Sequence, residues 1–328
     1  MVDMVTVGAG GGSIARVADG ALSVGPTSAG ADPGPACYGL GGAEPTVTDA
    51  HIVLGHLPPE LLGGRMRLNP ALAEAAVRRI AAPLGLGLHQ AARGILAIAD
   101  SNMVGAIRVV SVERGHDPRD FALVPFGGAG PLHGCALAEL LGIGTVLVPP
   151  APGVLCAEGL LAADLKAEFH RTLKQAGVPD EAAARAILAE LRGEAVAWLA
   201  AEQVPPADRV LEEVALMRYA GQGGELAVAW NGGTAPAQAA FTAAHQGLYG
   251  FTMEAPIELV TLRVEATGRL PAPVLPRLTE GAAATPIGAR MVHFAAGSRQ
   301  TPLYNRATLA AGAHFPGPAI ITQLDATT

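Results

Sequence analysis

The chain has 328 residues, of which half are hydrophobic and 4% are aromatic, so we expect a core built from alanine, leucine and valine. The formal net charge is −7, and no cluster of lysine and arginine occurs, which argues against a nucleic-acid-binding surface. Charges or turn residues interrupt every apolar run, and the N-terminus lacks a basic segment followed by an apolar stretch. We therefore expect a cytoplasmic protein with no membrane-spanning segment.

The first predicted element is a β-hairpin over residues 13–25. In SIARVADGALSVG, apolar and polar side chains alternate on both sides of the turn at Asp19 and Gly20. The glycine run before it, TVGAGGGS, matches a dinucleotide-binding loop only in part, because Ser13 stands at the third glycine position and a hairpin replaces the helix. The sequence contains no phosphate-binding G-x-x-x-x-G-K-[S/T] motif either. We interpret the run as a tight turn that needs the backbone freedom of glycine.

A loop rich in glycine and proline and three helices are predicted next. The loop, residues 25–49, is long and irregular but contains enough apolar residues to pack, which is typical of a functional loop. Thr48 and Asp49 are predicted to cap a helix over residues 50–57. Asn69 is predicted to cap a second helix that begins at Pro70, and a third helix is predicted from residue 88 to Gly115.

Residues 121–148 have the pattern of a β-α-β unit. An apolar strand over residues 121–126 is followed by a glycine turn, a helix over residues 131–141 and a strand over residues 145–148. This alternation predicts parallel strands and therefore an α/β fold. The sequence CAEGLLAADL, which follows, is predicted to be helical.

From Lys166 onward, strands and helices alternate. We predict strands in EFHRTL, on both sides of GQGG and in ELVTLRVEATGRL, and helices over residues 179–202 and 235–251. Short strands are predicted in a small β-rich subdomain from about residue 270. We therefore predict two domains, residues 1–165 and 166–328. Because the chain starts with a loop and ends within a strand-like sequence, we also expect it to be part of a longer protein.

The three cysteines lie too far apart in the sequence for a disulfide framework or a zinc-binding pattern. Cys135 occurs in an apolar run and is expected to be buried, whereas Cys37 occurs in the Gly/Pro-rich loop and is expected to be more exposed. A nucleophilic role for Cys37 has no support from a nearby histidine or asparagine.

The most informative glycine motif is FGGAGPLH, residues 126–133. It follows an apolar strand and opens a helix, so its backbone N–H groups and its glycines allow close approach of a ligand. His133, in the first helical turn, has two interpretations: a ligand contact, or a histidine that bonds a neighbouring carbonyl group. We favour the second.

Five motifs, taken together, resemble the hydantoinase A/oxoprolinase family. They occur in the same order as in the family, from Thr6 onward, and are long and rich in glycine and proline. The motifs are TVGAGGGSIARV, VGPTSAGADPGPACYGLGGAEPTVTDAHIVLGHL, VERGHDPRDFALVPFGGAGPLHG, VPPAPGVLCAEGLL and RYAGQGGEL.

This resemblance implies an α/β fold that forms the second lobe of an actin/Hsp70/sugar-kinase-like ATPase, with a C-terminal β-rich subdomain. It implies ATP-dependent opening of a cyclic amide, such as a hydantoin or 5-oxoproline, by phosphorylation of the substrate carbonyl. Related members of the family carboxylate ketones. The resemblance also implies ATP and Mg²⁺ as cofactors, a B-type partner subunit or domain, and a water-activating metal in that partner, with no metal ligands in this chain.

The resemblance assigns roles to particular residues. The residues expected on the adenosine side are Gly127, Gly128, Gly130 and His133. The residues expected to line the cleft between the lobes are Gly8, Gly10, Gly11, Gly12 and Ser13. Asp32 and Asp49 match family motifs and are catalytic candidates, although turn formation and helix capping account for them at least as well.

The sequence departs from the family pattern in several places. The D-x-G-G-T-type phosphate loops expected before TVGAGGGS do not occur in the sequence, and His51, Ala43 and Cys156 replace the usual asparagine, threonine and serine. We therefore expect this chain alone to be inactive. Three functions stay open: part of a cyclic-amide hydrolase, part of a ketone carboxylase, or a non-catalytic scaffold that docks a B-type subunit.

Overall fold

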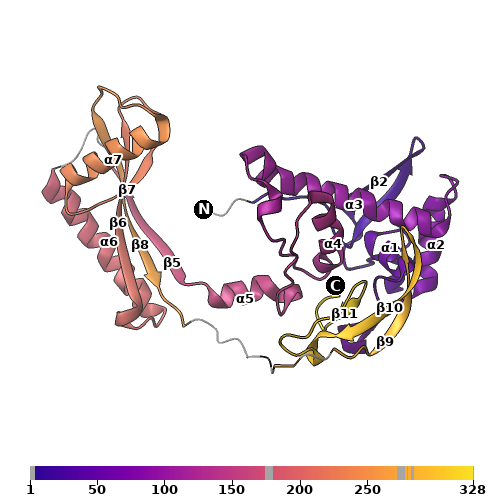
Figure 1. The fold of residues 1–328 in the computed structure, drawn as a ribbon. Coiled ribbons are helices and arrows are strands. Elements are labelled where there is room, and N and C mark those ends of the chain that lie inside the picture. The colour runs from indigo at the N-terminus through magenta and orange to yellow at the C-terminus, as the bar shows by residue number, and fades with distance from the viewer. Residues whose placement is uncertain (1–3, 174–179, 272–277, 279, 282–283, 328) are drawn as a thin grey trace. The chain divides into compact units, whose positions relative to one another are not determined.

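The computed structural model describes residues 4–173, 180–271, 278, 280–281 and 284–327. The chain forms two compact units, Met1–Ala157 with Pro276–Thr328, and Glu158–Leu275 (Figure 1). Both units combine helices with sheets, in agreement with the predicted α/β class. The domain boundary at 165/166 stays a prediction, and the predicted start of the β-rich subdomain, near residue 270, adjoins residues outside the described ranges. Short 3₁₀ helices connect the main elements at Ala36–Tyr38, Leu62–Gly64, Val112–Arg114, Pro118–Asp120, Pro152–Val154, Pro206–Asp208 and Arg306–Thr308.

The predicted N-terminal hairpin is confirmed. Strands β1 (Ser13–Ala18) and β2 (Ala21–Ser28) pair antiparallel, and Asp19 and Gly20 form the connection with φ angles of 52° and 76°. Two successive positive φ angles match the right-handed twist of the flanking strands. The hairpin packs through Ala15 and Val24 onto the helices of the first unit.

Helix α1 (Val47–Leu54) begins three residues earlier than predicted, and its predicted cap was wrong. Thr46 is the N-cap: its hydroxyl accepts a hydrogen bond from the Asp49 N–H at 3.3 Å, and the Asp49 carboxylate accepts one from the Thr46 N–H at 2.9 Å. This reciprocal pair satisfies two N–H groups that the helix itself leaves free. Asp49 is therefore the third residue of the helix, and the assignment of the cap to Thr48 and Asp49 was displaced by two residues.

Helices α2 (Pro70–Ala81) and α3 (Leu88–Val110) complete the helical layer of the first unit, and Asn69 caps α2 as predicted. Val47 and Leu54 of α1, Val77 of α2 and Ile95 of α3 are buried together in one core. Leu88–Arg114 is long and apolar enough to cross a membrane by length and composition alone. This differs from the expectation that every apolar run is interrupted. One face of α3 packs into this core, and 28% of the apolar window is buried.

The predicted β-α-β unit is confirmed in its helix, α4 (Gly130–Leu141), but not in the extent of its strands. Leu123 and Val146 form one isolated parallel bridge, in which Leu123 donates to Thr145 O at 2.9 Å and accepts from Leu147 N at 2.8 Å. Val124 and Leu147 lie more than a third exposed. In the described part of the chain no further strand pairs with this bridge, so the ladder does not extend. The predicted helix that follows is confirmed as α5 (Leu155–Ala162).

The C-terminal strands belong to the first unit. Strand β10 (Gly297–Asn305) pairs antiparallel with β9 (Gly288–Phe294) and parallel with β11 (Ile320–Thr322), and a small hairpin, β3 (Glu60–Leu61) and β4 (Met66–Arg67), lies in the same unit. Arg306 donates to Val148 O at 2.8 Å, and Gln323 donates to Pro150 O at 3.1 Å. These bonds fasten the C-terminal sheet to a loop more than 150 residues earlier, a relation that sequence patterns do not reveal.

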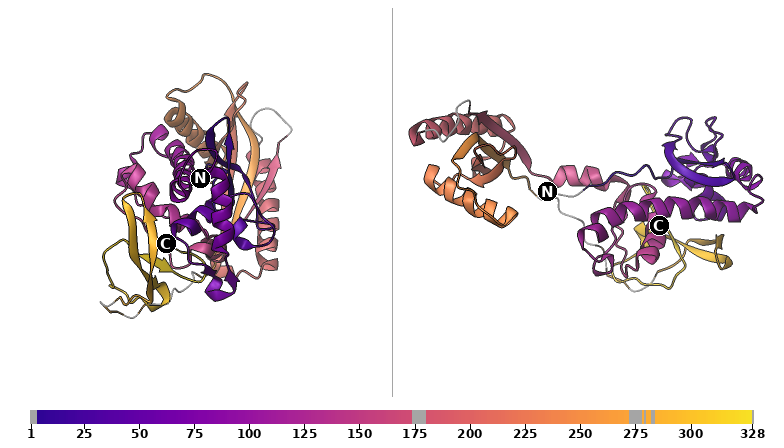
Figure 2. Two further views of the ribbon diagram at one scale, coloured as in Figure 1. Left: turned by 90° about the vertical axis from the view of Figure 1, so that its right-hand side faces the viewer. Right: turned by 90° about the horizontal axis from the view of Figure 1, so that it is seen from above.

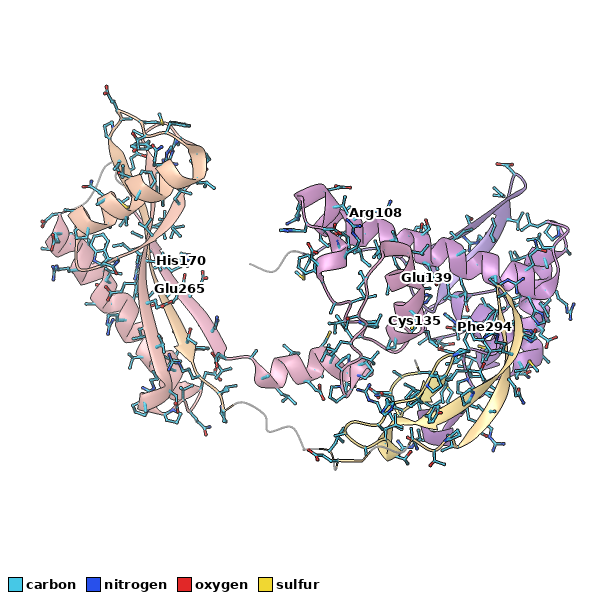
Figure 3. All side chains as sticks on the ribbon, in the orientation of Figure 1. Arg108, Cys135, Glu139, His170, Glu265 and Phe294 are labelled. Carbon is cyan, nitrogen blue, oxygen red and sulfur yellow. The ribbon has the colours of Figure 1, made fainter. Side chains whose placement is uncertain are left out.

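The second unit is an antiparallel sheet with both helices on one face, and its predicted elements are confirmed. The strand order is β5-β8-β6-β7, formed by β5 (Leu165–Thr172), β6 (Arg209–Tyr219), β7 (Leu226–Ala229) and β8 (Ile257–Gly268). Helices α6 (Glu181–Ala201) and α7 (Thr234–Tyr249) pack on the face that carries Ala215, Leu262 and Val264 (Figure 2). His170 and Glu265 alternate with the core residues of their strands and lie on the opposite face (Figure 3).

Gly55 provides a test of the contact between α1 and the C-terminal sheet. It closes α1 at φ 80°, and a Cβ at this position would overlap the carbonyl oxygen of Met291 in β9. We expect Gly55→Ala to lower the free energy of unfolding of the first unit by about 2–3 kcal/mol, from the left-handed backbone and the overlap together. Urea unfolding followed by circular dichroism measures this change.

The matched control is Gly85→Ala. Gly85 has φ 65°, but no heavy atom lies within 4 Å of a Cβ built there. We expect a loss of about 1 kcal/mol from the backbone alone. Tryptophan fluorescence reports only on the second unit, because both tryptophans, Trp198 and Trp230, lie in it. Equal losses for the two variants in circular dichroism would contradict the proposed contact.

Candidate functional site

A cavity of about 820 Å³ lies within the first unit. Its volume falls in the range of small-molecule sites, which is roughly 300–1,000 Å³. Both glycine turns singled out in the sequence reach it, together with α1 and the C-terminal strands. Its lining includes Gly11, Gly12, Tyr38, Thr48, His51, Glu60, Gly128, Leu303, Asn305, Thr322 and Asp325.

The first glycine turn is fixed to α1 by Thr48. The Gly11 carbonyl accepts hydrogen bonds from both the N–H and the hydroxyl of Thr48, each at 2.9 Å. Gly10 donates to the hydroxyl of Ser13 at 3.0 Å, and a Cβ on Gly10 would meet nothing within 4 Å. Gly11 and Gly12 line the cavity, whereas Gly8, Gly10 and Ser13 do not. Gly8 instead lies against Pro26, and Ser13 is buried.

The second glycine turn lies beside the first. Gly127 has φ 86° and donates to Pro152 O at 2.7 Å, and Gly128 lines the cavity. A Cβ on Gly127 or Gly128 would meet no heavy atom within 4 Å. Gly130 is the first residue of α4 and does not line the cavity. A Cβ on Gly11 would lie 3.5 Å from the Cβ of Ala129, so the two turns adjoin.

The two aspartate candidates occupy opposite environments. Asp49 is fully buried, and its carboxylate accepts four hydrogen bonds, from the N–H groups of Ala36, Cys37 and Thr46 and from the Thr46 hydroxyl, at 2.8–3.2 Å. These bonds use its acceptor capacity within the protein. Asp32 is exposed in the loop and does not line the cavity. The structure therefore gives Asp49 a structural task and places neither carboxylate at the cavity.

A chain of buried side chains lies behind the cavity wall. Asp100 Oδ1 is 2.6 Å from Nδ1 of His133, His133 Nε2 is 3.4 Å from Nε2 of His51, and His51 Nδ1 is 3.1 Å from Nδ1 of His56. His51 and His133 are each 2% exposed. His51 is the member of the chain that lines the cavity. The prediction that His133 binds a cofactor stays a prediction. In the structure its partners are a carboxylate and a second histidine, not the expected carbonyl group.

Burial disfavours the charged forms of His51 and His56. Burial, together with His133 and His56, lowers the pKa of His51 well below its usual value, and burial and His133 lower the pKa of His56 to about 4. One set of neutral tautomers satisfies every bond. His133 donates through Nδ1 to Asp100, His51 donates through Nε2 to His133, and His56 donates through Nδ1 to His51; this set is assigned from the hydrogen-bond partners.

These depressed pKa values predict that the first unit loses stability in acid. The unfolded chain binds protons near pH 6.5, whereas folded His51 and His56 bind them only at lower pH, so the unfolded state holds more protons in between. The free energy of unfolding should therefore fall from about pH 6.5 toward pH 4. His56 alone should account for about 2 kcal/mol at pH 5. Urea unfolding at several pH values, with His56→Asn for comparison, measures this slope. An equal slope in the variant would contradict the assignment to His56.

Sequence analysis did not predict the histidine chain. His51 was noted only as a replacement of the usual asparagine, and neither His56 nor Asp100 was predicted to take part in a site. Asp100 did give a signal, because it is a carboxylate within the apolar helical run ILAIADSNMVG. No spacing rule joins residues 51, 100 and 133, which come from three different helices.

The expectations for two cysteines were wrong. Cys37 is fully buried, because its loop folds over Asp49 and the Cys37 N–H donates to that carboxylate at 2.8 Å. Burial raises the pKa of the Cys37 thiol far above its usual value, which disfavours the thiolate. Cys135 is exposed because it lies on the outer face of α4 (Figure 3).

Two further features of the described residues bear on the site. Across the described ranges, no group of three or more histidine, cysteine, aspartate or glutamate residues is placed to hold a metal ion. A second hollow, of about 560 Å³, lies on the sheet of the second unit. None of the predicted site residues lines it, and its arginines are paired with its glutamates, as in Arg192–Glu213 at 3.1 Å.

Comparison with known proteins identifies the family. The family model described as "Hydantoinase/oxoprolinase" matches residues 1–169, just over half of the chain. The chain belongs to the hydantoinase/oxoprolinase family. The resemblance drawn from the motifs is thereby confirmed.

Similar proteins and solved structures extend this likeness along the chain. The alpha subunit of caprolactamase from Pseudomonas jessenii is 39% identical over 98% of the chain and 49% of its own length. A solved structure described as the ATP-dependent caprolactamase of the same organism matches with a TM-score of 0.73. The 5-oxoprolinase 1 of Arabidopsis thaliana is 31% identical over 98% of the chain and 27% of its own length. A nucleotide-free acetone carboxylase structure, which is 28% identical, matches 98% of the chain and 49% of its own length with a TM-score of 0.86. The chain therefore spans about half the length, or less, of these relatives.

Proposed function

We propose that the chain is part of an ATP-dependent enzyme subunit that opens a cyclic amide. The observation that carries this proposal is the convergence of the two glycine turns, at Gly11–Gly12 and Gly128, on one cavity of a hydantoinase/oxoprolinase-family chain. A caprolactamase and a 5-oxoprolinase, both named for cyclic amides, are among its relatives.

The proposed chemistry is phosphorylation of the substrate carbonyl. The carbonyl oxygen of the amide attacks the γ-phosphorus of ATP, which breaks the bond to ADP and gives a carbon that is more electrophilic than that of the amide. Water then attacks this carbon and the ring C–N bond breaks with protonation of the nitrogen, which leaves an acyl phosphate. A second water attacks the acyl carbon, and phosphate leaves with the former carbonyl oxygen, which gives the carboxylate. Phosphoryl transfer needs positioning and charge neutralisation more than covalent help from the protein.

The residues on the cavity fit these roles. The open space beside Gly128 suits the adenosine side of ATP, and the turn at Gly11–Gly12 suits the phosphates or the substrate. Glu60 and Asp325 line the cavity and offer carboxylate oxygens to Mg²⁺ or its water ligands. Within this proposal the first unit belongs to an actin/Hsp70/sugar-kinase-like lobe. A B-type partner supplies the water-activating metal, and the assembly works in the cytoplasm.

A second candidate function is ATP-dependent carboxylation of a ketone. The likeness to the acetone carboxylase structure, with a TM-score of 0.86, favours it. Both reactions begin with attack of a carbonyl oxygen on ATP, so the residues of this chain do not separate them. The substrate and the second nucleophile do.

The test uses the longer protein that contains this chain, assembled with its partner subunit. ADP release should require a lactam, hydantoin or 5-oxoproline, and a substrate labelled with ¹⁸O at the carbonyl should transfer the label to inorganic phosphate. Label retained only in the carboxylate product would overturn the phosphorylation step. ADP release that requires a ketone and bicarbonate would establish the second candidate, and absence of ADP release with both substrate classes would favour the scaffold.

A further inference from the structure

Five histidines gather where the helices of the first unit meet the C-terminal sheet. They come from α1, the segment after it, α3, α4 and β9, and we call them the histidine cluster: His51, His56, His89, His133 and His293. The chain has nine histidines in all, so more than half of them occur at this one junction.

Rings from the cluster contact β9 and the strand beside it. His89 on α3 stacks on His293, with ring centroids 3.7 Å apart and planes at 17°. The ring of His56 lies 6.2 Å from that of Phe294, the last residue of β9, which is labelled in Figure 3. His293 also shares a hydrogen bond of 2.7 Å with the hydroxyl of Ser298 on β10. Behind His56, the bond to His51 connects this junction to the buried chain that ends at Asp100.

The surrounding charges do not compensate added protons. Asp100, on α3, already bonds His133, so it can balance one proton in the chain. Glu74, on α2 near His89, is paired with Arg78 at 3.5 Å. Arg93 acts on His89, and Arg290 of β9 acts on His56; both are cations. The Nε of Arg290 is buried and has no hydrogen-bond partner. Every proton beyond the first therefore adds positive charge to a junction that already carries it.

We propose that the histidine cluster is an acid-sensitive latch, which holds β9 against α1 and α3 while its members are neutral and releases the C-terminal sheet when they are protonated. Two stacked imidazolium rings at the His89–His293 distance would repel, and a charged His56 would lack a nearby carboxylate of its own. The pKa values of His51, His56 and His89 are lowered, which means that the folded state disfavours their charged forms, as this repulsion requires.

Release of the sheet would change the candidate site. The cavity is lined in part by Leu303 and Asn305 of β10 and by Thr322 of β11. Strand β10 pairs with β9 on one side and with β11 on the other, so a shift of β9 would affect both lining strands. The latch therefore links acidity to the access and shape of the cavity. It does not depend on the activity proposed above, because it rests on the contacts of the sheet alone.

Hydrogen exchange of the full 328-residue chain tests the latch. We expect protection factors, corrected for the intrinsic pH dependence of exchange, to fall by about tenfold or more in β9 and β10 between pH 7.5 and pH 5. In the variant His56→Asn/His293→Asn, which lacks two of the protonation sites, protection should fall by less than in the wild-type chain. Protection that is independent of pH in the wild-type chain, or an equal loss in the variant, would overturn the proposal.

His170→Asn is the matched control, because His170 is an exposed histidine on β5 of the second unit. It should leave the acid response of β9 unchanged. If the double variant fails to fold at pH 7.5, the test is made by NMR titration of the wild-type chain. The imidazole signal of His56 should then change within the pH range over which the protection of β9 falls, and protonation of His56 without any loss of protection in β9 would overturn the latch.

Discussion

Replacement of Asp49 by alanine is expected to lower the free energy of unfolding of the first unit by about 3–5 kcal/mol. The carboxylate is fully buried and accepts four hydrogen bonds, three of them from backbone N–H groups. Alanine leaves those N–H groups buried without an acceptor. It also removes one half of the capping box at the start of α1 and the anchor of the loop that carries Cys37. Urea unfolding followed by circular dichroism measures the loss.

Two comparisons separate this structural role from catalysis. Asp49→Asn keeps the shape but loses acceptor capacity, so it should cost roughly half as much as alanine. Asp32→Ala, at an exposed position away from the cavity, should change stability by less than about 0.5 kcal/mol. If Asp49→Ala folds with unchanged stability but the longer protein loses activity, the structural assignment is wrong and catalysis gains support.

Replacement of Gly128 by valine is expected to lower the nucleotide affinity of the longer protein by about 100-fold or more, which corresponds to about 3 kcal/mol. Gly128 lines the cavity, and a Cβ there meets no atom of the chain within 4 Å. A Cβ is therefore compatible with the fold, and the valine side chain would occupy the space proposed for adenosine. Titration calorimetry with Mg-ATP measures the affinity.

Gly144→Val is the matched control for this variant. Gly144 is exposed, a Cβ there also meets open space, and it does not line the cavity. Both variants should unfold like the wild-type chain, and only Gly128→Val should bind nucleotide weakly. Unchanged affinity in a folded Gly128→Val protein would remove the adenosine assignment from this turn.

Local sequence signals predicted most of the fold. The Asp19-Gly20 turn, the Asn69 cap and the strands β5, β6 and β8 depend on neighbours within a few residues, and they were predicted correctly. The start of α1 was predicted wrongly because two threonines could cap the helix. Thr46 forms the reciprocal pair with Asp49, whereas the hydroxyl of Thr48 donates to the Gly11 carbonyl. The length of the strand at residues 121–126 was overestimated, because an apolar run shows only that a segment can be buried and not that a second strand pairs with it.

The candidate site was only partly predictable. Gly11, Gly12 and Gly128 were recognised from their motifs, and the structure brings all three to one cavity. The C-terminal wall of that cavity and the histidine cluster depend on contacts between segments far apart in the sequence. His89 and His293, for example, are separated by about 200 residues and yet stack. Such pairs leave no periodic signal in a single sequence.

The pairing of β5 with β8 brings the two ends of the second unit together. The second unit is entered through β5 and left through β8, and Leu165 lies opposite Gly268 in the ladder, while Asp164 accepts a hydrogen bond from the Leu270 N–H at 3.0 Å. The entry and exit points are therefore neighbours, which is the geometry of a module inserted into a host loop. A short linker can span these two points, so we expect that the module can be excised without a break in the chain path of its host.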